Sequence, residues 1–125
     1  GSEPAYTGEQ LFADYFIAGE LEIVPQRGGT ITAEVARNET LYRQSLKLIT
    51  LHNPALPIEN FTYLSSLPDF EYREEAGWTL ALIYVKHNRR EQAKEALRPL
   101  IVSKSFYASK ASELSRKLDE TRWFN

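Results

Sequence analysis

The side chains that could do acid–base or metal chemistry are few in this chain. His52 and His87 are its two histidines, and none of its 125 residues is cysteine. Each histidine falls near the C-terminus of a predicted helix, where a solvated imidazole is stabilised by the helix dipole. No HExxH or GxSxG motif is present, and Gly28 and Gly29 fit a turn better than a phosphate-binding loop. We therefore expect no enzyme activity, no cofactor and no bound metal.

A group of carboxylates could in principle bind a metal ion or form an acid–base pair. The group consists of Asp69, Glu71, Glu74 and Glu75. These residues precede or begin a predicted helix, where the macrodipole favours negative charge. A capped helix start is therefore the interpretation that we favour.

A run of basic residues raises the question of an anionic partner. It comprises Lys86, His87, Arg89, Arg90, Lys94 and Arg98. Trp78 could add a surface on which a nucleotide base stacks. Glu91 and Glu95 interrupt the run, however, and the chain has a formal net charge of -2. We favour a solvated face of mixed charge, with an anionic protein as the alternative partner and nucleic acid as the least favoured one.

The composition is typical of one soluble globular domain, with 42% hydrophobic and 26% charged residues. Because methionine is absent and the chain opens with Gly1 and Ser2, we expect residues 1–7 to be a tag scar and a flexible start. No apolar run of about eighteen residues occurs, so any signal peptide, lipid anchor or membrane helix of a parent protein would lie upstream.

Hydrophobic periodicity predicts an N-terminal helix followed by an extended arm, together spanning residues 8–31. Apolar and aromatic side chains from Leu11 to Phe16 recur at helical spacing within residues 8–17. Residues 20–24 alternate charged and apolar side chains, as a short extended segment does. We expect the arm to lie over a helical domain at residues 32–122, which is followed by a tail at residues 123–125.

The first two helices of that domain are predicted from spacing and from proline. One runs over residues 32–52 and ends at Asn53. The next begins near Pro57, which suits the first turn of a helix, and ends at Pro68. Their expected buried positions are Val35, Leu41, Tyr42, Leu46, Leu48, Ile49, Ile58, Phe61, Leu64 and Leu67.

Three more helices complete the predicted domain. The first covers residues 72–87, and Asn88 is expected to adopt the left-handed conformation that ends it. The second covers residues 89–102, where the internal Pro99 predicts a kink or an early end. The last helix is expected to be capped by Ser105 and to bury Phe106 or Tyr107, Ala111, Leu114 and Leu118.

Small residues indicate how two of these helices pack. Ala81 and Ala93 lie on either side of Asn88, and helices approach closely only where side chains are small. The region therefore predicts an antiparallel helical hairpin. The two helix pairs can also be aligned at an offset of about 35 residues, close to the period of a two-helix solenoid repeat.

One motif connects these features to a known family. Its residues are Gly77, Trp78, Thr79, Leu80 and Ala81, followed by Tyr84, Asn88, Ala93, Leu97 and Leu100. The motif resembles a tetratricopeptide repeat, with Asn88 in place of the usual glycine. This resemblance implies an all-α fold of tetratricopeptide-like antiparallel hairpins in a short right-handed solenoid. The first pair departs from the family pattern, since Leu46 and Ile58 stand where small residues are preferred.

The order of the elements resembles a narrower group, the envelope tetratricopeptide proteins of Bacteroidetes. The resemblance covers most of the chain, from the aromatic N-terminal helix through the arm and both repeat units to the last helix. It implies a periplasmic domain that holds another protein and that belongs to a larger envelope or membrane-attached protein. A cytoplasmic location is the alternative.

In a tetratricopeptide-like stack the first helix of each pair lines a concave surface. The candidate protein-binding residues are Arg43, Lys47, Thr50, Trp78, Leu82 and Lys86. Arg43 and Lys47 could bind a peptide carboxylate, although Thr79 stands where the family's carboxylate clamp has an asparagine. The alternative for Trp78 and Leu82 is burial against the N-terminal helix or the arm.

Two repeat-like pairs are few, because each pair buries its apolar face only against a neighbour. The N-terminal aromatic helix and the C-terminal helix with Trp123 and Phe124 could cap the two ends of the stack, or they could expose apolar surface that drives self-association. The expected function is thus non-catalytic protein binding. A structural homo-oligomerisation module is the alternative.

Overall fold

The computed structural model describes residues 6–23 and 31–120. All regular secondary structure in these residues is helical, which confirms the predicted all-α fold for this part of the chain. Residues 24–30 of the expected arm and the expected cap at Trp123 and Phe124 lie outside the described residues. The helices are α1 (Gly8–Tyr15), α2 (Ala18–Leu21), α3 (Ala33–Leu46), α4 (Ala55–Ser66), α5 (Arg73–Lys86), α6 (Arg90–Val102) and α7 (Ala108–Glu120).

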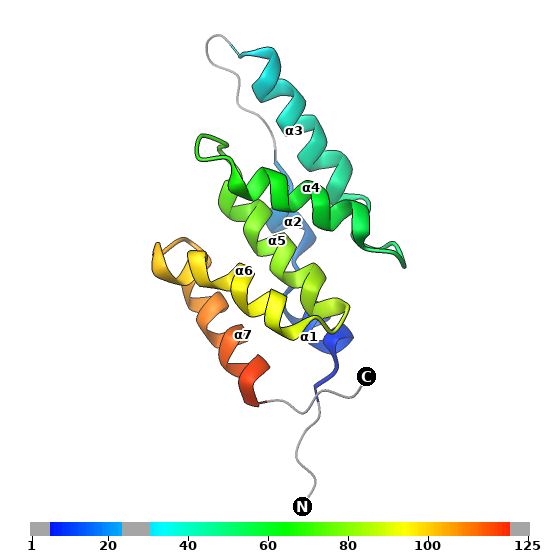
Figure 1. The fold of residues 1–125 in the computed structure, drawn as a ribbon, viewed down its shortest axis with the longest axis vertical. Coiled ribbons are helices and arrows are strands. Elements are labelled where there is room, and N and C mark those ends of the chain that lie inside the picture. Colours follow the sequence, from blue (N-terminus) through cyan, green and yellow to red (C-terminus); the bar gives the residue numbers. More distant parts are fainter. Residues whose placement is uncertain (1–5, 24–30, 121–125) are drawn as a thin grey trace, which may run out of the picture.

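From α3 to α7, each helix packs against the next one along the chain, and α1 packs against α5. Figure 1 shows these five helices following one another down the long axis of the molecule, with a reversal of direction at each connection. None of the helices in the described residues is long and apolar enough to cross a bilayer.

Local hydrogen bonds set the start of α1, and the segment after it differs from the prediction. The Thr7 hydroxyl accepts from the Gln10 backbone N–H at 3.1 Å, and the Gln10 side chain accepts from the Thr7 N–H, which forms a capping box. The extended segment predicted from residue 20 is wrong at its start, because α2 continues to Leu21. Its helical turn directs Leu21 into the core, where the side chain is buried.

Helix α3 is shorter than predicted. Thr32 caps its N-terminus by accepting from the Val35 N–H at 3.1 Å. The helix ends at Leu46 rather than near residue 52, because the following N–H groups bond to carbonyls three residues earlier, as in Leu48 N–H to Ser45 at 3.0 Å. These tighter turns still bury Ile49. Val35, expected in the core, is 44% exposed.

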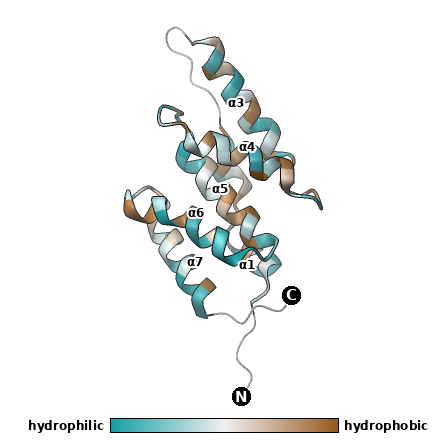
Figure 2. Ribbon diagram, viewed as in Figure 1, coloured by the Kyte–Doolittle hydropathy of each residue, from teal (hydrophilic) through white to brown (hydrophobic). Residues whose placement is uncertain are grey.

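Helix α5 is the centre of the fold, since its side chains enter both hydrophobic clusters of the core. Trp78 and Leu82 belong to the cluster shared with α1, α6 and α7, whereas Leu80 and Ile83 belong to the one shared with α3 and α4. Figure 2 shows apolar residues along α5 and hydrophilic residues on the visible side of α6. The position of α5 between its neighbours explains why it is buried on nearly all sides.

The connection between α5 and α6 matches the sequence prediction, whereas the prediction for Pro99 does not hold in full. Asn88 has φ of 60°, the left-handed conformation that ends a helix. Pro99 does not end α6 early, because its exposed ring lies in the last turns and the helix continues to Val102. The Pro99 carbonyl still accepts from the Ser103 N–H at 3.0 Å.

Helix α7 begins after a second left-handed residue. Lys104 has φ of 54°, and the Ser105 hydroxyl accepts from the Tyr107 N–H at 3.1 Å. This turn buries Tyr107 and leaves Phe106 79% exposed, which settles the alternative that the sequence left open. Ala111, Leu114 and Leu118 are buried as predicted.

Candidate protein-binding groove

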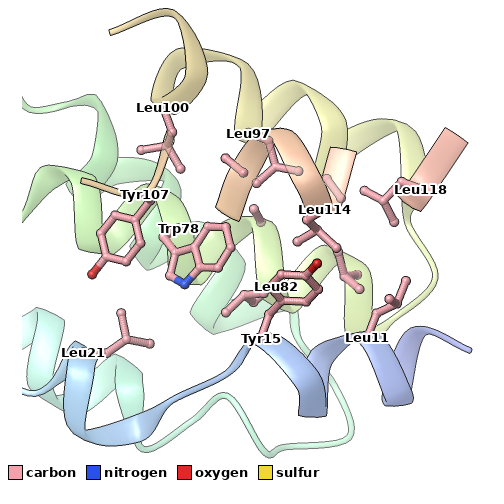
Figure 3. Packing of buried hydrophobic residues seen from close by; sticks show 14 residues of the cluster. Leu11, Tyr15, Leu21, Trp78, Leu82, Leu97, Leu100, Tyr107, Leu114 and Leu118 are labelled. Carbon is pink, nitrogen blue, oxygen red and sulfur yellow. The ribbon is translucent and has the colours of Figure 1, made fainter. Parts of the chain in front are cut away.

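Two of the six candidate binding residues are part of the core. Trp78 is 1% exposed and Leu82 is 0% exposed, so neither can contact a partner in this structure. Figure 3 shows both side chains between Tyr15 of α1 and Tyr107. The Trp78 indole stacks on the Tyr107 ring, with centroids 5.3 Å apart. Their candidate role on a concave surface is therefore wrong, and the alternative is confirmed: both are buried where α1 covers this face of α5.

Polar contacts fasten the N-terminal segment to α7. The Tyr15 hydroxyl donates to the Glu113 carboxylate, and the Lys117 ammonium lies 3.4 Å from the same carboxylate. The two contacts lower the pKa of Glu113, with the bond from Tyr15 as the larger cause. In α2, Glu20 pairs with Lys110 at 3.2 Å. Both short helices are thus held by charge-assisted contacts as well as by apolar packing.

The other half of the candidate set lies in the last turn of α3 and in the turns that follow it. Arg43, Lys47 and Thr50 are exposed. Arg43 and Lys47 line a groove of about 490 Å³, but Thr50 is not part of its lining. The groove also includes Glu22, Ile23, Thr40, Gln44 and Leu46. The structure therefore brings together only the pair that was predicted to bind a carboxylate.

The floor of this groove is apolar and its rim is polar. Ile23 is buried and belongs to the same core cluster against which Leu46 packs. A buried hydrogen bond of 2.7 Å from the Tyr42 hydroxyl to the Leu21 carbonyl holds the segment before Ile23 against α3. Burial, and secondly the charge of Glu75, raise the pKa of Tyr42, so this hydroxyl remains a donor.

Charge and spacing determine what the groove can bind. Arg43 and Lys47 lie one helical turn apart, and Glu22 is the one carboxylate among the described residues of the lining. Such a groove suits a segment that carries an acidic group beside apolar side chains. Thr40 and Gln44 were missed from the sequence, although they share the helical spacing of Arg43 and Lys47. The contribution of Ile23 was missed because its segment was interpreted as an extended arm.

Lys86, the last candidate, has a different role. Its ammonium lies 5.0 Å from the centroid of the Phe12 ring, so it contributes to the contact between α5 and α1. It is not among the residues that line the groove beside Arg43. The six candidates thus do not form one continuous surface.

Two residues of the basic run, Arg90 and Lys94, pair with neighbouring groups. Arg90 lies 3.7 Å from the Glu91 carboxylate and donates to the Leu118 carbonyl at 3.4 Å. Lys94 forms an ion pair with Asp119 of α7. These contacts favour the solvated face of mixed charge over a nucleic-acid surface.

The two histidines differ in environment. His52 is exposed, whereas His87 follows the last residue of α5 and its Nε2 is buried with no hydrogen-bond partner among the described residues. Burial, followed by the positive charges of Lys86 and Arg89, lowers the pKa of His87. Over residues 6–23 and 31–120, no group of three or more His, Cys, Asp or Glu side chains is placed to hold a metal ion.

Comparisons of this chain with models of protein families, with curated proteins and with solved structures found no match. The fold and the groove beside α3 are therefore the features that bear on function.

Proposed function

We propose that this chain is a non-catalytic protein-interaction domain that binds a partner through the groove at Arg43 and Lys47. The groove is the single observation that carries the proposal. It combines an apolar floor at Ile23 and Leu46 with two exposed cations on one helix face. Interfaces of this kind gain affinity from the desolvated floor and select a partner through the charged rim.

The fold supports a tetratricopeptide-like scaffold for this groove. Ala81 and Ala93 are both fully buried, as expected where two helices of a hairpin approach closely. Residues 87–89 connect α5 to α6, and the longer stretch 47–54 connects α3 to α4. We propose that α5 and α6 form a repeat unit of this type and that α3 and α4 form a divergent one.

The cellular setting is proposed from the resemblance to the Bacteroidetes envelope proteins. In this proposal the domain is the soluble scaffold part of a larger periplasmic, envelope or membrane-attached protein. Fractionation of the source cells, followed by detection with an antibody to this domain, tests the location. Recovery in the cytoplasmic fraction alone would contradict it.

A comparison of charge-reversed variants tests the binding function. The wild-type domain and an Arg43→Glu/Lys47→Glu variant serve as baits in a cross-linked pull-down from source-cell fractions. Arg89→Glu/Arg98→Glu, which reverses two exposed cations elsewhere, is the matched control. We expect a protein recovered by the wild type and the control but not by the groove variant. Equal recovery by all three would contradict the proposal.

A second function, structural homo-oligomerisation, is favoured by one observation. Val102 and Phe106, on either side of the turn between α6 and α7, are 75% and 79% exposed. An apolar pair at an exposed turn is a candidate contact between copies of the chain. Sedimentation velocity over a range of concentrations tests this function. Homo-oligomerisation predicts that the mass in solution increases with protein concentration, and that a Val102→Ser/Phe106→Ser variant abolishes this increase.

A further inference from the structure

A second groove lies on the N-terminal half of α3, where this helix faces the connection between α4 and α5. Its volume is about 500 Å³. Five apolar or aromatic side chains contribute to its lining: Val35, Leu67, Pro68, Phe70 and Tyr72. The carboxylates in the lining are Glu34, Glu39, Asp69 and Glu71, and Asn38 completes it. This acidic groove shares no lining residue with the groove at Arg43 and Lys47.

Aromatic rings form a rigid wall of the acidic groove. The rings of Phe70 and Tyr72 meet at 75° with centroids 5.8 Å apart, and the Tyr72 ring lies 6.0 Å from that of the buried Tyr42. Packing on two neighbours fixes the Tyr72 ring, while part of its surface stays accessible. An accessible aromatic face attracts cations through its quadrupole.

The electrostatic environment of the acidic groove is strongly one-sided. Among the described residues that line it there is no Lys, Arg or His, in contrast to the groove at Arg43. Burial, and secondly the charges of Glu71 and Glu39, raise the pKa of Tyr72, whereas the charge of Arg43 lowers it. A cation entering the groove would be attracted by the exposed carboxylates and by the accessible ring of Tyr72.

The arrangement of the carboxylates indicates whether the groove suits a metal ion or a cationic side chain. In the part of the chain that the structure describes, no three acidic side chains converge as metal ligands do. Glu34, Asp69 and Glu71 are instead exposed and Glu39 is buried, and they lie beside apolar lining residues that include Val35, whose side chain is 44% exposed. A long cationic side chain fits this groove, because its methylenes can cover apolar surface while its charged end reaches the rim.

We infer that the acidic groove docks a segment of a protein partner in which Arg or Lys alternates with apolar residues. Charge complementarity identifies this occupant, since a guanidinium can stack on Tyr72 and bond to a rim carboxylate at the same time. The apolar residues of the segment would contact Val35 and Leu67. The inference does not depend on the proposed function of the Arg43 groove, because the two sites use different residues and attract opposite charges.

A titration monitored by NMR tests this inference. The probe is an acetylated and amidated hexapeptide in which Arg alternates with Leu, added to the ¹⁵N-labelled chain. We expect amide shifts centred on Val35, Asn38 and Tyr72, and binding that weakens with added salt. The same peptide with Glu in place of Arg should not bind, and the peptide with Ser in place of Leu should bind more weakly.

Two double variants test whether the peptide binds at the acidic groove. Glu34→Gln/Glu71→Gln removes two exposed rim charges and should weaken binding about three- to tenfold, the loss expected for two surface charge contacts. Glu59→Gln/Glu95→Gln removes two exposed charges elsewhere and should leave the affinity unchanged. Equal weakening in both variants, or shifts centred on another surface, would overturn the inference. It would also be overturned if shifts at these amides rose with protein concentration alone, because the occupant would then be a second copy of the chain.

Discussion

The ring of Tyr15 stands edge-on to the indole of Trp78, with the ring centroids 6.2 Å apart and the ring planes at 75°. This contact joins the first helix of the chain to the central helix of the stack. It also explains why the face of α5 that was expected to bind a partner is covered by the chain itself. Of the six candidate residues, Arg43 and Lys47 remain exposed beside one another.

The buried position of Trp78 predicts a large effect on stability. Trp78→Ala should lower the free energy of unfolding by about 3–5 kcal/mol, because it removes the side chain of α5 that packs in one cluster with α1 and stacks on Tyr107. Urea unfolding measures the change. Phe106→Ala is the control, since its ring is 79% exposed and its removal should change stability by no more than about 0.5 kcal/mol. Similar losses in the two variants would contradict the packing described here.

The close approach of α1 to the end of α5 predicts opposite effects at two glycines. A Cβ at Gly8 would overlap the Val85 carbonyl oxygen and lie 2.5 Å from Asn88 Oδ1, whereas a Cβ at Gly19 meets nothing within 4 Å. Gly8→Ala should therefore destabilise the chain by about 1–3 kcal/mol. Gly19→Ala should be neutral or stabilise it by up to about 1 kcal/mol, because alanine is favoured in a helix. Thermal unfolding of both variants measures the change in stability. An unchanged stability of Gly8→Ala would contradict the close approach of α1 to the end of α5.

The hydrogen bond from Tyr15 to Glu113 predicts a local effect. Tyr15→Phe keeps the ring against Trp78 but removes the hydroxyl that holds α1 to α7. Amide hydrogen exchange should become faster in α1, while exchange in α3 and α4 stays unchanged. Tyr63→Phe removes the hydroxyl of a 45% exposed tyrosine and should change neither region. Unchanged exchange in α1 of Tyr15→Phe would show that apolar packing alone holds this helix.

His87 predicts a dependence of stability on pH. Its pKa is lowered in the folded state, chiefly by burial, so the unfolded chain binds more protons below its ordinary pKa of about 6.5. The neutral form thus contributes stability above that value, and the contribution is lost as pH falls through the folded-state pKa. The positive charges of Lys86 and Arg89 also lower the pKa of His87, and the negative charge of Glu9 raises it.

Removal of this imidazole should reduce the pH dependence. Between pH 7.5 and 5, the free energy of unfolding of His87→Gln should fall less than that of the wild type, as measured by urea unfolding at each pH. His52→Gln, at an exposed position, should change the curve much less, because the charge of His52 is the smallest of the causes that act on the pKa of His87. Parallel curves for wild type and His87→Gln would show that the imidazole does not influence folding.

The sequence predicted the helical class and the central hairpin well, because their signals are local. Asn88 tolerates the left-handed conformation, and the small Ala81 and Ala93 identify where the helices meet. Lys104 also adopts φ of 54°, and lysine offers no such signal. The end of α3 was missed because Leu48 and Ile49 continue an apolar pattern, although the backbone there changes to tighter turns.

The residues of the candidate groove were predicted only in part, for a physical reason. Arg43 and Lys47 share a helix face, and this follows from their spacing alone. Whether Trp78 and Leu82 face solvent depends on where the N-terminal helix packs, which is a long-range contact that periodicity does not encode. The acidic groove likewise forms only where Glu34 of α3 and Asp69, which are far apart in the sequence, come to line the same opening.

Site-specific photo-cross-linking tests the central claim most directly. A photo-reactive amino acid replaces Gln44 in the groove beside Arg43 or, as a control, the exposed Gln92 of α6. On irradiation in source-cell extracts, we predict an adduct with another protein from position 44, none from position 92, and loss of the adduct when Arg43→Glu/Lys47→Glu is added. Identical adducts from both positions, or an adduct that survives the charge reversal, would contradict the proposed binding groove.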